Sequence, residues 1–230
     1  MNVFTPRFRR MARRRLRAWA AALLLAFFCA PASQALTMAD LLVPGATLDS
    51  GSLRFADFVY VPSTPNQPVA AAVTVSPIVD GSGHHGVRIE GLFGDDSGTL
   101  GPSGAGIAFS VSVLDPLLLI DGAFLEGNPS VTAIGEIKVS ESIDSLPSES
   151  LEIFADSLSG GPVFSQTSDS APVSPRASLG VVIDGVIGYA ATGEAVLTRF
   201  DQTFSVVPEP STALLLALGL LSFALARRRN

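Results

Sequence analysis

The chain has 230 residues, of which 47% are hydrophobic and 16% charged, and its formal net charge is −6. Ten of its fifteen basic residues are arginines in the two terminal segments, so residues 36–206 hold twenty acidic and five basic residues, a net charge of −15. This body repels nucleic acid and anionic lipid, which excludes nucleic acid as a partner. The single cysteine, Cys29, lies in the N-terminal segment. The body therefore has no disulfide and must be stabilised by a buried core.

Residues 1–35 have the three parts of a secretory signal peptide. Seven arginines come first, residues 18–30 are apolar, and Ser33-Gln34-Ala35 fits a small-x-small cleavage site. We expect export through the Sec translocon and cleavage by signal peptidase after Ala35. Met11 is an alternative start that would shorten the basic region.

Residues 36–206 alternate between apolar and polar side chains with the period of half-buried β-strands. Gly, Pro, Asn, Asp and Ser interrupt the alternation at 63–68, 80–86, 94–106, 127–130 and 157–162. We expect strands at 53–61, 69–75, 87–93, 107–113, 117–125, 131–139, 151–155, 178–190 and 196–206. Some nine short antiparallel strands predict an all-β domain, either a β-sandwich or a jelly roll.

Three local features refine this picture. Between Phe55 and Phe58 the apolar alternation slips by one residue, which predicts a bulge around Ala56 and Asp57. Asp40-Leu41-Leu42 is expected to open the domain with a short helical turn. Gly160-Gly161 favours a hairpin over a helical turn after the strand at 151–155.

His84 and His85 are the only histidines, and they lie in a Gly-rich stretch. On a strand they would point to opposite faces, and in a loop they would bind a metal only with a partner such as Asp80. We interpret them as part of a solvated turn and as weak metal-site candidates.

Asp95 and Asp96 also lie in a Gly-rich segment, and acidic loops of extracellular domains can bind calcium through carboxylate oxygens. The segment lacks the spacing of an EF-hand. A solvated turn is therefore favoured, with calcium as the alternative. No other cofactor is predicted.

No catalytic residue is assigned. The body lacks a cysteine nucleophile, and the segment Gly101–Ala105 departs from the G-x-S-x-G elbow at its last position. A Ser/His/Asp triad and a pair of glycosidase carboxylates both stay open, because sequence does not show spacing. Tyr60 and Tyr189 are the body's only tyrosines, which weakens the case for sugar stacking. We expect a protein that is not an enzyme.

The C-terminal residues 207–230 have three parts: Val207-Pro208-Glu209-Pro210-Ser211, an apolar run at 212–226, and a basic end at 227–230. The uncharged residues 211–226 would span about 24 Å as a helix, which is short for a hydrocarbon core of about 30 Å. We expect a marginal single transmembrane helix. Its basic residues, Arg227, Arg228 and Arg229, are expected to stay in the cytoplasm.

These three parts, in this order, resemble the PEP-CTERM sorting signal of Gram-negative bacteria. The body also resembles an uncharacterised β-rich group of PEP-CTERM proteins, through Asp40-Leu41-Leu42, residues 51–58 and residues 201–205. The resemblance implies that exosortase, a membrane enzyme of species that make exopolysaccharide, recognises and processes the tail. It also implies a transient inner-membrane intermediate facing the periplasm, and then a protein at the cell surface or outside the cell.

Three functions are compatible with this sequence. The favoured one is a structural or interaction protein of the envelope or extracellular matrix, linked to exopolysaccharide or biofilm. The first alternative is a module that binds polysaccharide or calcium, and the second is a secreted hydrolase.

Overall fold

The computed structural model describes residues 34–64, 66–96, 102–144, 150–157 and 160–209, together with Leu215, Leu216, Leu218 and Gly219. Ser33, Pro210, Ser211 and the three C-terminal arginines lie outside the described residues, as does most of the predicted tail helix. The four described tail residues have helical backbone. Within the described part of the chain, no helix has the length and apolar character needed to cross a membrane.

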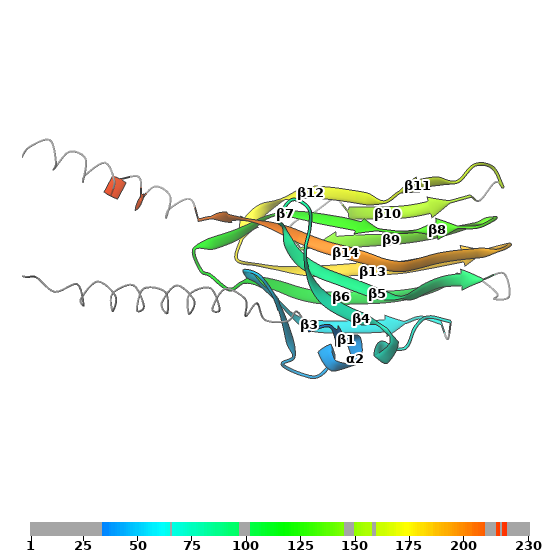
Figure 1. Cartoon of the computed structure of the whole chain (residues 1–230), viewed down its shortest axis with the longest axis horizontal. Coiled ribbons are helices and arrows are strands. Elements are labelled where there is room, and N and C mark those ends of the chain that lie inside the picture. Colours follow the sequence, from blue (N-terminus) through cyan, green and yellow to red (C-terminus); the bar gives the residue numbers. More distant parts are fainter. Residues whose placement is uncertain are drawn as a thin grey trace, which may run out of the picture. The chain divides into compact units, whose positions relative to one another are not determined.

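The body is an all-β sandwich of two antiparallel sheets, as predicted (Figure 1). The first sheet, sheet A, has the order β1-β4-β5-β14-β7-β12, and β8 also pairs with β14. Its strands are β1 (Leu36–Thr37), β4 (Thr74–Val79), β5 (His85–Asp96), β14 (Glu194–Pro208), β7 (Leu118–Gly127), β12 (Ser168–Arg176) and β8 (Ser130–Val131).

The second sheet, sheet B, has the order β11-β10-β9-β13-β6-β3-β2. Its strands are β11 (Phe164–Gln166), β10 (Ser150–Asp156), β9 (Gly135–Ile143), β13 (Ser178–Ala190), β6 (Ser103–Val113), β3 (Leu53–Pro62) and β2 (Thr47–Ser50). Two short helices complete the domain: α2 (Met38–Leu41) and the 3₁₀ turn η1 (Ala70–Ala72).

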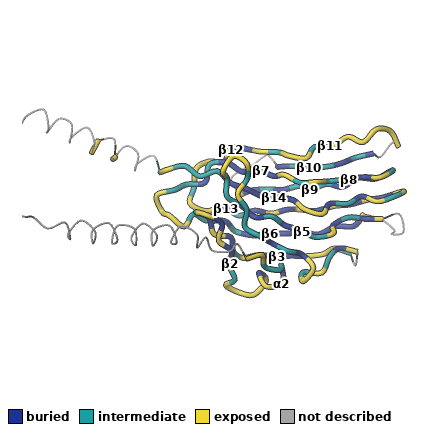
Figure 2. Tube along the Cα trace, viewed as in Figure 1, coloured by how far each residue is buried: buried dark blue, intermediate teal, exposed yellow. Residues whose placement is uncertain are grey.

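The core lies between the sheets, where the inward residues of each strand are buried (Figure 2). Its largest fully buried side chains include Phe55 of sheet B and Phe93, Phe200 and Phe204 of sheet A. The rings of Phe55 and Phe204 meet across the sandwich with centroids 6.1 Å apart. Aromatic side chains of this size contribute much of the apolar area that stabilises a domain without disulfides.

The predicted local features are confirmed. Pairing of β3 with β6 shifts register between Ala56 and Val59, and Asp57 has a positive φ of 56°, so a bulge lies where the apolar alternation slips. Thr37 caps α2 with a capping box that includes Asp40, which explains the helical turn. β10 pairs with β11 as the expected hairpin.

Two strand predictions and one loop prediction are wrong in part. The segment 69–75 begins with η1, and its strand runs from Thr74 to Val79. The segment 131–139 divides into β8 and β9, because the chain crosses from sheet A to sheet B around residues 132–134. The predicted loop at 94–106 is shorter, since β5 continues to Asp96 and β6 begins at Ser103.

Three strands were not predicted: β1, β2 and β12. β12 contains Pro172 and Pro175 and is polar on one face. It lies at the edge of sheet A, where a proline need not donate to a neighbouring strand. Its edge position therefore explains why a strand forms from a segment with the composition of a loop.

Candidate functional sites

The sorting tail begins inside the folded domain. β14 continues through Val207 and Pro208, which pair with Leu119 and Leu118 of β7. The backbone N–H of Glu209 then donates to the Leu117 carbonyl oxygen at 2.8 Å. The segment is extended and is held by the sheet. No flexible linker separates the sandwich from the first three residues of the motif.

His84 lies at the end of the expected turn, but its side chain is only partly exposed and packs against its neighbours. Its Nδ1 lies 2.7 Å from Oδ2 of Asp80, the partner considered from the sequence. Its ring stacks on Phe124 of β7 with centroids 4.2 Å apart and an angle of 12° between the planes. His84 thus joins the loop before β5 to the surface of sheet A.

His85 is the first residue of β5, and its ring packs beside Gly51 in the turn between β2 and β3. The two adjacent histidines therefore do not form one site. Nδ1 of His85 is buried, and it has no hydrogen-bond partner among the described residues. A Cβ at Gly51 would clash with this ring.

Replacing Gly51 by alanine is expected to lower the free energy of unfolding by more than about 1 kcal/mol, because the residue has a φ of 57° and no room for a Cβ. Gly45→Ala is the matched control, since Gly45 also has a positive φ but no atom within 4 Å of the added Cβ. Urea unfolding of the two variants measures the contribution of the His85 contact. If Gly51→Ala and Gly45→Ala lowered the free energy of unfolding by the same amount, the close contact of Gly51 with the His85 ring would not be the cause of the loss.

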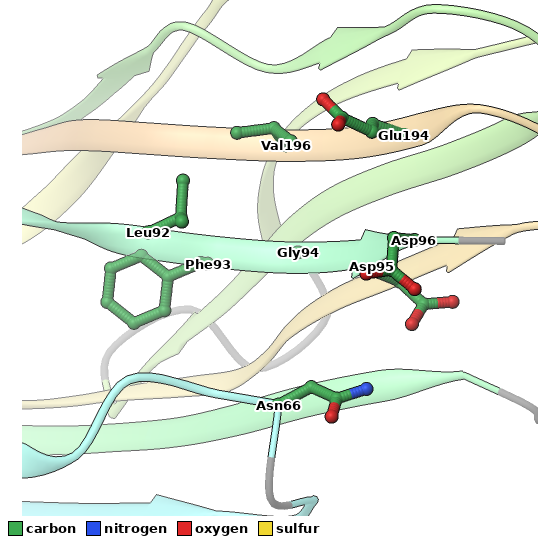
Figure 3. Close-up of a pocket in the computed structure, with 8 residues that line it drawn as sticks. All are labelled: Asn66, Leu92, Phe93, Gly94, Asp95, Asp96, Glu194 and Val196. Atoms are coloured by element: carbon green, nitrogen blue, oxygen red, sulfur yellow. The ribbon is translucent and has the colours of Figure 1, made fainter. Parts of the chain in front are cut away.

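Asp95 and Asp96 end β5 and line a pocket of about 190 Å³ with Asn66, Glu194 and four other residues (Figure 3). Asp95 is only 6% exposed and accepts a hydrogen bond from the Ala190 backbone N–H of sheet B at 3.1 Å. Asp96 lies opposite Glu194 in the backbone pairing of β5 with β14. The acidic segment is thus strand rather than solvated turn, and Asp95 joins the two sheets.

The acidic residues of this pocket do not converge on one point. Within the residues that the structure describes, no group of three or more His, Cys, Asp or Glu side chains is placed to hold a metal ion. Ca²⁺ is usually bound by six to eight oxygen atoms in proteins. The described carboxylates thus supply only part of such a shell.

A larger groove of about 390 Å³ lies on the outer face of sheet A and is called the β7–β14 groove here. Two rows of paired residues cross four strands there. One row is Ser170, Phe124, Thr203 and Gly86, and the other is Ser168, Glu126, Asp201 and Arg88. Because Phe200 and Phe204 point into the core, Asp201 and Thr203 point outward.

Hydrogen bonds and an ion pair fix the polar side chains of the β7–β14 groove. Nε and Nη2 of Arg88 donate to the two carboxylate oxygens of Asp201 at 2.8 and 2.7 Å. The hydroxyl of Thr203 donates to Asp80, which also accepts from the backbone N–H groups of Ser82 and His84. Burial favours the neutral form of Asp80, but the hydrogen bonds from the backbone and ring of His84 and from the backbone of Ser82 outweigh it and hold the pKa of Asp80 below its usual 3.8. Asp80 is therefore ionised at neutral pH.

Glu141 is an acid buried inside the sandwich, on the inward face of β9 with Val139 and Ile143. It is 0% exposed, and neither of its carboxylate oxygens has a hydrogen-bond partner among the described residues. Burial, with a further contribution from the charge of Asp169, raises the pKa of Glu141 well above 4.5. An unpaired acid in a core is costly and marks a place where the sequence is not optimised for stability.

Sequence reasoning missed Glu141 and the β7–β14 groove. Glu141 continues the inward alternation of Ile137 and Val139, and extending that alternation by one step would have placed it in the core. The groove has a weaker signal: Asp201 and Thr203 alternate with core residues, but no sequence pattern sets them beside Phe124 and Asp80.

Comparison with protein families finds the PEP-CTERM protein-sorting motif at residues 206–229. The match begins at Val206, which forms the third pair from the end of β14 with β7, and it covers the whole predicted tail except Asn230. The chain is therefore an exported protein that is handled at the membrane, and its motif implies processing by an exosortase-type membrane enzyme.

No curated protein matches the chain. Among solved structures, a similar one is TmCBM61 in complex with β-1,4-galactotriose. It is 11% identical, with a TM-score of 0.26, over 66% of this chain and 88% of the other. Similarity at this level does not assign a ligand to the present protein.

Proposed function

We propose that the mature protein is a structural or interaction protein of the cell envelope or extracellular matrix, delivered after exosortase processing and associated with exopolysaccharide. The observation that carries this proposal is the position of the sorting motif at the end of β14. Removal of the chain after Pro208 leaves every described strand of both sheets complete. Processing would thus release an intact sandwich.

The charge of the body supports the same function. With a net charge of −15, the body is repelled by anionic lipid, so it would not stay on the membrane once the tail is removed. Self-repulsion of this size also keeps a concentrated extracellular protein soluble.

The geometry at the histidines favours a non-enzymatic protein over a hydrolase. Asp80 orients Nδ1 of His84 as a carboxylate does in a catalytic triad. In the described residues, however, no Ser, Thr or Cys side chain is hydrogen-bonded to the His84 ring. A nucleophile in reach of the base is the part of that machinery that a hydrolase requires.

The proposal predicts a processed C-terminus. Mass spectrometry of the mature protein from a host with exosortase should show a chain that ends near Pro208 to Ser211 and accumulates outside the inner membrane. Glu209→Ala should leave the tail in place, because it removes the charged residue of the motif.

Glu90→Ala is the control, since Glu90 is an exposed glutamate of β5 outside the motif. It should be processed like the wild type. A wild-type protein that keeps its full C-terminus, or a processed protein found only in the cytoplasm, would contradict the proposed function.

A further inference from the structure

The β7–β14 groove combines fixed side chains with polar groups that are not engaged within the protein. The Asp80–His84–Thr203 cluster and the Arg88–Asp201 pair are fixed by the contacts above. Around them, the hydroxyls of Ser82, Ser168 and Ser170 and the carboxylate of Glu126 form no hydrogen bond to any described residue. Rigid side chains beside unengaged donors and acceptors are typical of a binding site.

The charge of the groove limits its ligands. Its lining carries three outward carboxylates, on Asp80, Glu126 and Asp201, and the neighbouring cation Arg88 is already paired with Asp201. An anionic ligand would be repelled, since no lining Lys or Arg is available to pair with it. Phosphate, sulfate and uronate polymers are therefore excluded.

The shape and chemistry of the groove indicate an extended, hydroxyl-rich ligand. Four strands about 4.8 Å apart give the two residue rows a length of about 14 Å. The unengaged groups are mainly hydroxyls, which both donate and accept, and Phe124 with His84 supplies the apolar surface on which a sugar ring can lie. An apolar peptide helix would leave these hydroxyls and Glu126 without partners, which is costly.

We propose that the β7–β14 groove binds a pyranose chain without acidic groups, a neutral or amine-bearing segment of polysaccharide. This inference rests on the proposed function, because it names the ligand of a matrix protein. Glu126 would accept from a sugar hydroxyl or pair with a sugar ammonium group, and the serines would bind the remaining hydroxyls. Asp80 and Asp201 would keep the side chains of His84, Thr203 and Arg88 in fixed positions.

Calorimetry of the full chain in detergent tests the proposal with four β-linked hexasaccharides, made of glucose, N-acetylglucosamine, glucosamine and galacturonate. We expect binding of the neutral or amine-bearing chains and none of galacturonate. If the bound chain carries amines, glucosamine should bind about threefold tighter than N-acetylglucosamine, the size expected of one exposed ion pair, and Glu126→Gln should remove the difference.

Ser170→Trp fills one row of the groove and should weaken binding at least about tenfold, the effect of losing one or two hydrogen bonds. Ser178→Trp is the control, because Ser178 is an exposed serine on β13 of the other sheet. The proposal is overturned if all four hexasaccharides give no heat, if galacturonate binds as well as the others, or if a folded Ser170→Trp protein binds like the wild type. None of these results would alter the processed C-terminus, so the proposed function is tested separately.

Discussion

A disulfide between Val207→Cys and Leu119→Cys is expected to block processing of the sorting tail. The two residues are directly paired across β14 and β7, one residue before Pro208. A membrane enzyme that cleaves at the motif must bind an extended chain with its backbone groups free, and here the sheet already occupies them. The end of β14 must therefore open before the enzyme can engage it.

The disulfide prevents that opening while leaving the motif itself unchanged. Each 1.4 kcal/mol added to the cost of opening lowers the population of the open strand tenfold, so a covalent link should slow processing by more than about tenfold. The body has no cysteine of its own, so no other disulfide competes. Mass spectrometry of the C-terminus before and after addition of a reductant gives the measurement, and the reductant should restore processing.

A second disulfide distinguishes this effect from a general stabilisation. Ser112→Cys with Ser178→Cys joins a directly paired position of β6 and β13 in sheet B, and neither of these strands pairs with β14. This variant should be processed at the wild-type rate. If the oxidised Val207–Leu119 variant is also processed at that rate, the enzyme recognises the motif without opening of β14.

The alternation of apolar residues was sufficient to predict the fold class and one fine detail, the bulge at Ala56 and Asp57. A bulge changes which residues point inward, so it can be detected from the apolar alternation of one strand alone. The sequence of β12 carries no such signal, since its prolines and serines are typical of a loop. Only its position at the edge of sheet A allows a strand there.

The β7–β14 groove illustrates what a single sequence does not contain. Asp80 and Thr203 are 123 residues apart in the chain and are joined by a hydrogen bond of 3.3 Å. Their proximity depends on strand order and register, which are set by the packing of both sheets together. The alternation indicates which face each residue occupies, but it does not indicate its neighbour on that face.

Replacing Glu141 by leucine is expected to raise the free energy of unfolding, and most strongly at alkaline pH. Burial raises the pKa of Glu141 in the folded protein well above 4.5, whereas the unfolded chain has the ordinary value. Between these two pKa values the folded state keeps a proton that the unfolded state loses. The wild type is therefore most stable, as far as this residue is concerned, below pH 4.5, and it loses up to about 1.4 kcal/mol for each pH unit above it.

Glu141→Leu removes this loss and also the cost of a buried polar group without a partner, so we expect a gain of about 2 kcal/mol or more at pH 7. Urea unfolding at pH 5 to 8 provides the measurement, and the gain should increase with pH. Glu141→Gln separates the two contributions, because it keeps a buried polar group but cannot ionise. It should remove the pH dependence while giving less stability than leucine.

Glu136→Gln is the matched control, since Glu136 lies on the same strand but is partly exposed. It should leave the pH dependence of the wild type unchanged. A gain from Glu141→Leu that is equal at pH 5 and pH 8 would show that Glu141 finds a partner for its charge in solution. A loss of stability at pH 8 would mean that this carboxyl stabilises the core, and the burial of an unpaired acid would then be the wrong explanation.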